Sequence, residues 1–130
     1  MNRIITAAIA LAALAIPATA EASSCGRYVL LLQQHAVAIQ IGGDKLGHYG
    51  DYMNSFGDNP TEAGLPTAKA TVREAKATAR ATLREVDRSM VTLQRARNIG
   101  CVSQAQVNMM KGKATRTRAA LRKVINIQFP

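Results

Sequence analysis

The chain is poor in aromatic residues, in cysteine and in acidic side chains. Its 130 residues include no tryptophan, 3 tyrosines, 2 phenylalanines and 2 cysteines. Two cysteines exclude a disulfide-dense miniprotein, and 9 glycines with 4 prolines exclude a collagen-like chain. The composition also excludes a multi-pass membrane protein. Because 48% of the residues are hydrophobic, the chain can bury a core, and its length fits one domain.

Motifs that carry catalysis or hold a cofactor are also missing. The sequence has no glycine-rich phosphate loop, and the patterns C-x-x-C, C-x-x-C-H, H-E-x-x-H and G-x-S-x-G do not occur. Asp44, His48 and Asp51 have the spacing of metal ligands on one helix face, but nearby glycines weaken a helix there. We therefore predict no enzymatic activity, no cofactor and no metal. A small enzyme or metal-binding protein that uses residues 44–58 is kept as an alternative.

The first twenty residues have the organisation of a secretory signal peptide. Asn2-Arg3 supplies a positive start, the segment 4–16 is apolar, and Ala18-Thr19-Ala20 is a small-residue cleavage site. The apolar segment is too short for a permanent membrane helix. We predict cleavage after Ala20, a periplasmic or secreted protein without a membrane span, and a single domain over residues 21–130.

The two cysteines allow two hypotheses, a lipid anchor or a disulfide. Cys25 follows Ser24 in a sequence that loosely resembles a lipoprotein processing site, so a lipid anchor at Cys25 is an alternative. The cysteine nevertheless lies far beyond the apolar segment, and lipidation would leave Cys101 unpaired. In an oxidising compartment, we expect a disulfide between Cys25 and Cys101 instead.

The spacing of apolar residues predicts an all-α protein. We expect helices over residues 25–41, 67–98 and 103–127, and a short, frayed helix over 44–56. Gly42-Gly43 is expected to end or kink the first helix. Thr67 is expected to cap the second helix, which Gly100 ends, and Ser103 with Gln106 predicts a capping box on the third.

An antiparallel arrangement of the first two long helices places Cys25 beside Cys101. This agreement predicts a small antiparallel three-helix bundle, or a four-helix bundle if residues 44–56 contribute, with one disulfide. Apolar residues lie on two opposite faces of the 25–41 helix: Tyr28, Leu32 and Ile39 on one, and Leu30, Val37 and Ile41 on the other. We therefore expect this helix to be buried between the other two, with extension into a homo-oligomer as an option. His35 is expected to be a core or interface histidine bonded by Gln33 or Gln34.

Charge is distributed unevenly along the chain. Residues 21–66 have an excess of acidic side chains, whereas residues 67–130 contain 14 Lys and Arg against 3 acidic residues. At 100° per residue, seven cations of the 67–98 helix fall in a sector about 120° wide, beside the apolar stripe. They are Lys69, Arg73, Lys76, Arg80, Arg84, Arg88 and Arg95. This sector is named the basic stripe.

The basic stripe is either a solvated surface or a site for a polyanion. We expect an exported binding protein that uses it to contact an envelope protein or an anionic polymer, such as lipopolysaccharide or an acidic glycan. Nucleic acid is a less favoured partner because no aromatic side chains lie among the cations. A structural or assembly subunit of an envelope or secretion complex is the alternative.

Overall fold

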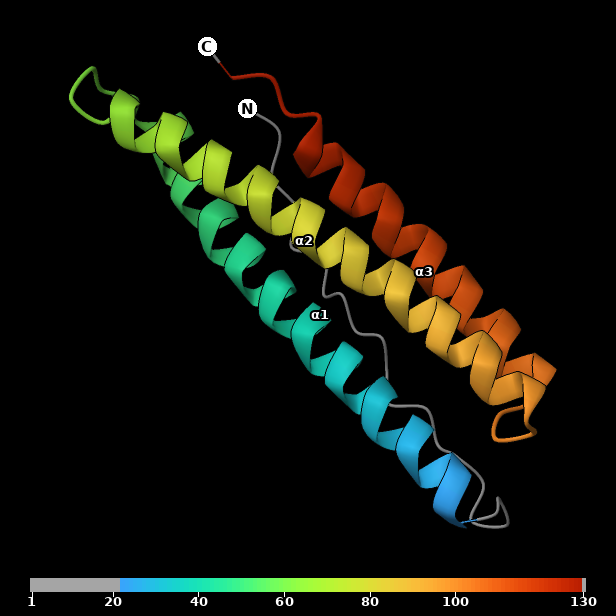
Figure 1. Cartoon of the computed structure of the whole chain (residues 1–130). Helices are drawn as coiled ribbons and strands as arrows, with labels where there is room; N and C mark the ends of the chain where they lie inside the picture. Colours follow the sequence, from blue (N-terminus) through green and yellow to red (C-terminus); the bar gives the residue numbers. More distant parts are fainter. Residues whose placement is uncertain (1–21, 130) are drawn as a thin grey trace.

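The computed structural model describes residues 22–129, which form three α-helices and no strand (Figure 1). These are α1 (Ala22–Asp58), α2 (Leu65–Asn98) and α3 (Gln104–Ile125). The prediction of an all-α, three-helix protein is confirmed. The predicted signal peptide, residues 1–20, lies outside the described residues. No helix in residues 22–129 has the length and apolar character needed to cross a membrane.

α2 is the central helix. α1 and α3 each pack against α2, and within residues 22–129 these two outer helices do not pack against each other (Figure 1). The expectation that the first helix lies between the other two is therefore wrong. Leu30, Val37 and Ile41 on the outer face of α1 are 56%, 58% and 51% exposed, because no helix of the described chain covers them.

The position of α2 follows from its continuous stripe of small and apolar residues. Its buried residues recur every three or four positions: Ala68, Val72, Ala75, Ala79, Thr82, Val86, Ser89, Leu93 and Ala96. The sequence predicts Leu83 and Met90 as inner companions of this stripe, but the structure leaves them only partly buried. Small side chains instead occupy many of the inner positions. The hydroxyl groups of Thr82 and Ser89, which are buried there, donate hydrogen bonds to backbone carbonyls of α2 itself. Thr82 donates to the carbonyl of Thr78 (2.8 Å) and Ser89 to that of Val86 (2.7 Å).

α1 continues without a break through Gly42 and Gly43, where the sequence predicts an end or a kink. Gly42 is buried against α2. A Cβ atom there would lie 2.1 Å from Thr82 Oγ1 and 3.1 Å from Thr82 Cβ. The glycine therefore permits a close approach of two helices, and packing against α2 offsets its low helix propensity. The expected short helix at 44–56 is the second half of α1.

The helix ends agree in part with the sequence. α2 begins at Leu65 with Gly64 as its N-cap and a proline in its first turn, so Thr67 is not the cap. Gly100 has φ of +80°, the left-handed stop that the sequence predicts. Ser103 and Gln106 form the predicted capping box, and α3 ends two residues before the expected Ile127. The sequence also predicts a stripe on α3 with a spacing of three and four residues, and this stripe is buried: Val107, Met110, Ala114, Thr117, Leu121 and Val124.

Two contacts hold α1 at its ends. Cys25, in the first turn of α1, forms the predicted disulfide with Cys101, just after α2, with a Cα–Cα distance of 5.4 Å. At the opposite end, Phe56 of α1 meets Phe129 of the segment after α3, with ring centroids 6.2 Å apart in an edge-to-face arrangement.

Candidate functional site: the basic stripe and the adjoining groove

The basic stripe lies on the side of α2 that is turned away from the buried residues. Six of its cations are exposed and Lys76 is partly buried. α1 approaches α2 at Thr82 and Glu85, and α3 approaches it at Asp87. The stripe occupies the surface between these two approaches. Along the helix axis it extends about 39 Å, from Lys69 to Arg95.

Within the described residues, few acids neutralise the stripe. Arg88 makes its only ion pair, at 3.5 Å to Glu85, and the Arg88 side chain is 67% exposed. Asp87 lies among the cations in sequence, but its carboxylate accepts a 2.8 Å bond from Arg118 Nε of α3. The other six cations make no ion pair within residues 22–129. Their positive charge is therefore open to solvent and to other molecules.

One edge of α3 widens the positive surface. Arg118, through its bond to Asp87, places this edge beside the basic stripe. Lys111 and Arg122 follow the same edge, seven residues before and four residues after Arg118. The sequence contains no Asp or Glu after Asp87, so α3 adds cations only.

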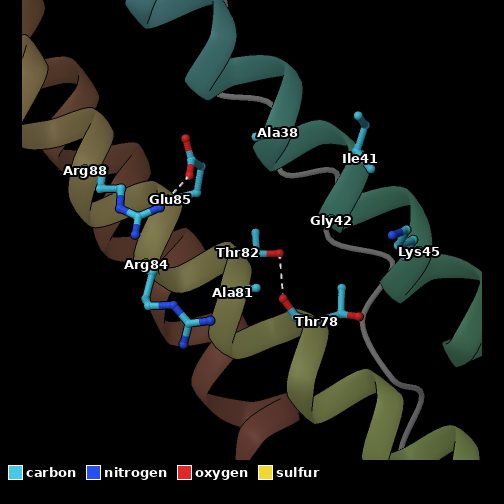
Figure 2. A pocket seen from close by; sticks show the side chains of 10 residues that line it. All are labelled: Ala38, Ile41, Gly42, Lys45, Thr78, Ala81, Thr82, Arg84, Glu85 and Arg88. Carbon is cyan, nitrogen blue, oxygen red and sulfur yellow. Dashed lines mark hydrogen bonds and ion pairs between the residues drawn. The ribbon is translucent and has the colours of Figure 1, made fainter.

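A groove of about 370 Å³ lies between α1 and α2 and joins the basic stripe (Figure 2). Lys45 of α1 and Arg84 and Arg88 of α2 line it, so cations from two helices meet there. Its other lining residues are Ala38, Ile41, Gly42, Thr78, Ala81, Thr82 and Glu85. Gly42 and Thr82 bring the two helix backbones close together at its floor, and small residues such as Ala38, Thr78 and Ala81 make up half of its lining.

Glu85 is the one acid of the groove lining, and both of its oxygens are engaged. Oε1 lies 2.5 Å from His35 Nδ1, and Oε2 lies 3.5 Å from a guanidinium nitrogen of Arg88. His35 Nε2 lies 3.0 Å from Thr92 Oγ1, which itself donates to the carbonyl of Arg88 at 3.1 Å. The Thr92 hydroxyl has one proton. While it is donated to Arg88, Thr92 can only accept from His35.

His35 thus connects Glu85 and Thr92 of α2 to α1. The groove lining contains three cations, Lys45, Arg84 and Arg88, and one acid, so its net charge is positive. The sequence predicts the interface position of His35, but its partners are Glu85 and Thr92 across the helix contact and not the neighbouring glutamines.

The order Thr92, His35, Glu85 is that of a nucleophile, a base and an acid. Thr92, however, lies within α2, six residues before its end, where helical hydrogen bonds occupy the backbone N–H groups that an oxyanion would need. The arrangement joins α1 to α2 and keeps Arg88 at the edge of the groove.

Residues 44–51 offer no assembled metal centre. His48 and Asp51 are exposed on α1, and Asp44 accepts a bond from Gln40 Nε2 at 2.9 Å. In the described part of the chain, no three His, Cys, Asp or Glu side chains gather within reach of one metal ion.

Lys45 is the residue that sequence reasoning misses. The sequence places it in an ambiguous acidic region, because Gly42-Gly43 is expected to interrupt the helix. The cysteine pair contains the signal that could have identified it. If both helices are unbroken and antiparallel, the twentieth residue after Cys25 lies opposite the twentieth residue before Cys101. These residues are Lys45 and Ala81, so Lys45 lies near Arg84.

Comparisons with protein-family models, with curated proteins and with solved structures found no match to this chain.

Proposed function

We propose that this protein is a non-enzymatic binding protein that acts outside the cytoplasm. Its basic stripe contacts an anionic envelope polymer, such as lipopolysaccharide or an acidic glycan. The observation that carries this proposal is the exposed row of cations on α2, of which only Arg88 has an ion pair within residues 22–129. Support for export comes from the signal-like residues 1–20 and from the disulfide.

Electrostatic repulsion within the stripe supports a binding role. Arg80, Arg84 and Arg88 follow one another at intervals of four residues, and like charges at this spacing destabilise a helix. Asp87 could relieve the repulsion, but it is bound to Arg118. A polyanion lying along α2 would neutralise several of these cations at once and release its counterions.

The test is retention on immobilised heparin and on lipopolysaccharide across a salt series. We expect strong retention at low salt that falls steeply as salt rises, because counterion release drives the binding. The double variant Arg80→Glu with Arg84→Glu should lose most of its retention. Both side chains are exposed, so the helical content of the variant should match that of the wild type.

The matched control reverses two exposed cations on the far side of α3, Arg116→Glu with Lys123→Glu. This control changes the net charge by the same amount but leaves the stripe intact. Greater loss with the stripe variant than with the control supports a specific surface. Equal losses would indicate that net charge alone controls retention, and no retention of the wild type would reject the proposal.

A second function, as a subunit of an envelope assembly, is favoured by one observation. Leu30, Val37 and Ile41 form an exposed apolar row on α1, within about 40° of one another around the helix. Such rows often mark protein–protein contacts. Sedimentation of the purified protein over a concentration series tests whether copies of the chain associate through this row. The expected result for an assembly subunit is a concentration-dependent oligomer that Val37→Asp abolishes.

A further inference from the structure

The groove between α1 and α2 has apolar residues in its lining, whereas the basic stripe that it adjoins consists of cations. Ile41, which is half exposed, and Ala38 line its α1 side, and Ala81 lies across from them on α2 (Figure 2). Lys45, Arg84 and Arg88 supply its positive charge. A polysaccharide needs only the cations. Apolar residues beside them suit a ligand that has both an anionic group and a hydrocarbon part.

Outside the groove, the exposed apolar row of α1 reaches the groove at Ile41. Val37 lies one turn before Ile41 on the same outer face, and Leu30 lies two turns earlier. Lys45 follows Ile41 by one turn. The exposed face of α1 therefore changes from apolar to basic at the groove. This order matches a lipid, in which a hydrocarbon chain is followed by a charged head group.

The cations that line the groove come from both of its sides. Lys45 comes from α1, whereas Arg84 and Arg88 come from successive turns of α2. Arg88 is positioned by Glu85, whose other oxygen is bound to His35. Phosphate is the group that such a combination of guanidinium and ammonium donors binds well, because guanidinium provides paired donors and ammonium a compact charge.

We propose that the groove binds the phosphorylated head group of an anionic amphiphile, whose hydrocarbon part lies against Ile41 and Val37. This inference rests on the proposed function and narrows it: the part of the polymer that is recognised is a phosphorylated lipid end and not a lipid-free acidic chain.

The affinity of the protein for vesicles of phosphatidylcholine with phosphatidylglycerol tests the proposal. The variant Lys45→Gln with Arg84→Gln should bind about 30-fold more weakly than the wild type, since each cation near an anionic surface contributes about fivefold. Lys69→Gln with Arg73→Gln is the matched control. These two residues lie at least about 16 Å from Arg84 along α2, beyond the Debye length at physiological salt. The control should bind within about fivefold of the wild type.

Ile41→Ser separates an amphiphile from a free anion. We expect vesicle binding to fall about tenfold while heparin retention stays unchanged, because heparin has no hydrocarbon to lose. Inorganic phosphate at matched ionic strength should compete with vesicles only weakly. Full competition by inorganic phosphate, or equal vesicle binding by Ile41→Ser and the wild type, would contradict the assignment of an amphiphile as the ligand.

The two proposals fail in different ways. If the wild type binds heparin and lipopolysaccharide but the groove variant matches its control on vesicles, the groove assignment is wrong and the polyanion surface stands. If the wild type is retained on neither polymer, the proposed function itself is wrong. Circular dichroism of each variant confirms that its helices are intact.

Discussion

α1 and α3 lie on two flanks of α2, and the two contacts differ in what joins the helices. The α1–α2 contact has a disulfide at one end, a glycine against Thr82 in the middle, and a partly buried His35–Glu85 pair. The α2–α3 contact has a regular stripe of apolar residues, with Arg118–Asp87 at its surface. Apolar burial holds both outer helices, through Ile39, Leu46 and Met53 on the α1 side, but only the α1–α2 contact adds a disulfide and a partly buried polar pair.

This difference matches the positions of the exposed groups. α1 leaves Leu30, Val37 and Ile41 uncovered, and the groove opens on its side of α2. Burial of Ile39, Leu46 and Met53 stabilises the α1–α2 contact, and the disulfide and the polar contacts add to that stability.

The largest effect is expected from removal of the disulfide. Cys25→Ala with Cys101→Ala should lower the free energy of unfolding by about 4 kcal/mol, because the bond constrains the unfolded chain over a sequence separation of 76 residues. Chemical denaturation measures this loss, and wild-type protein unfolded with a reductant should give the same value. An unchanged midpoint would show that α1 is held by its other contacts.

The second prediction compares two glycines of α1. Gly42→Ala should lower the free energy of unfolding by about 1–3 kcal/mol, since the new methyl group overlaps Thr82. Gly47→Ala is the control. Its Cβ would meet no atom within 4 Å, so the higher helix propensity of alanine should raise stability by about 0.5–1 kcal/mol. Thermal denaturation of the two variants checks this, and effects of the same sign would contradict the close approach at Gly42.

The third prediction compares one interhelical side-chain pair on each flank of α2 by double-mutant cycles. The His35–Glu85 side chains are 15% and 20% exposed, and those of Arg118 and Asp87 are 28% and 57% exposed. We expect a coupling energy of about 1 kcal/mol or more for the first pair and no more than about 0.5 kcal/mol for the second. Substitutions to Gln or Asn, followed by urea denaturation, provide both values. Added salt should weaken the second pair more than the first.

The smallest effect is expected at the outer face of α1. Val37→Asp should change the free energy of unfolding by no more than about 0.5 kcal/mol, because the side chain is exposed in the single chain. The same change in a buried helix would cost several kcal/mol. Thermal melting over a range of protein concentrations measures it. A large loss at high concentration only would reveal a second copy covering this face.

The sequence predicts the elements with regular spacing and strong end signals. α3 follows from apolar residues spaced three and four apart and from Ser103 with Gln106. α2 follows from Val72, Ala79, Val86 and Leu93, which recur every seven residues, and from Gly100. The pairing of Cys25 with Cys101 follows from the antiparallel arrangement of α1 and α2. These features are local, or depend on one simple geometric step, and local patterns are what a single sequence records well.

The arrangement of α1 could not be predicted because it depends on contacts with another helix. Gly42 and Gly43 have low helix propensity, and only the space beside Thr82 shows why a glycine is accommodated there. The two apolar faces of α1 suggest burial on both sides, but an apolar outer face does not reveal whether a neighbour covers it. The basic stripe follows from spacing alone. The groove and Lys45 require the interhelical register, which only an unbroken α1 defines.

The central place of α2 has a consequence for how the molecule opens. Because α1 and α3 share no contact between helices in the described chain, neither can protect the other from hydrogen exchange once α2 unfolds. α3 can separate while the disulfide-linked α1–α2 hairpin keeps its amides protected, but no paired unit survives without α2. Amides of α2 should therefore exchange last, at a rate set by global unfolding, and a protease should remove α3 before it reaches either partner of the hairpin.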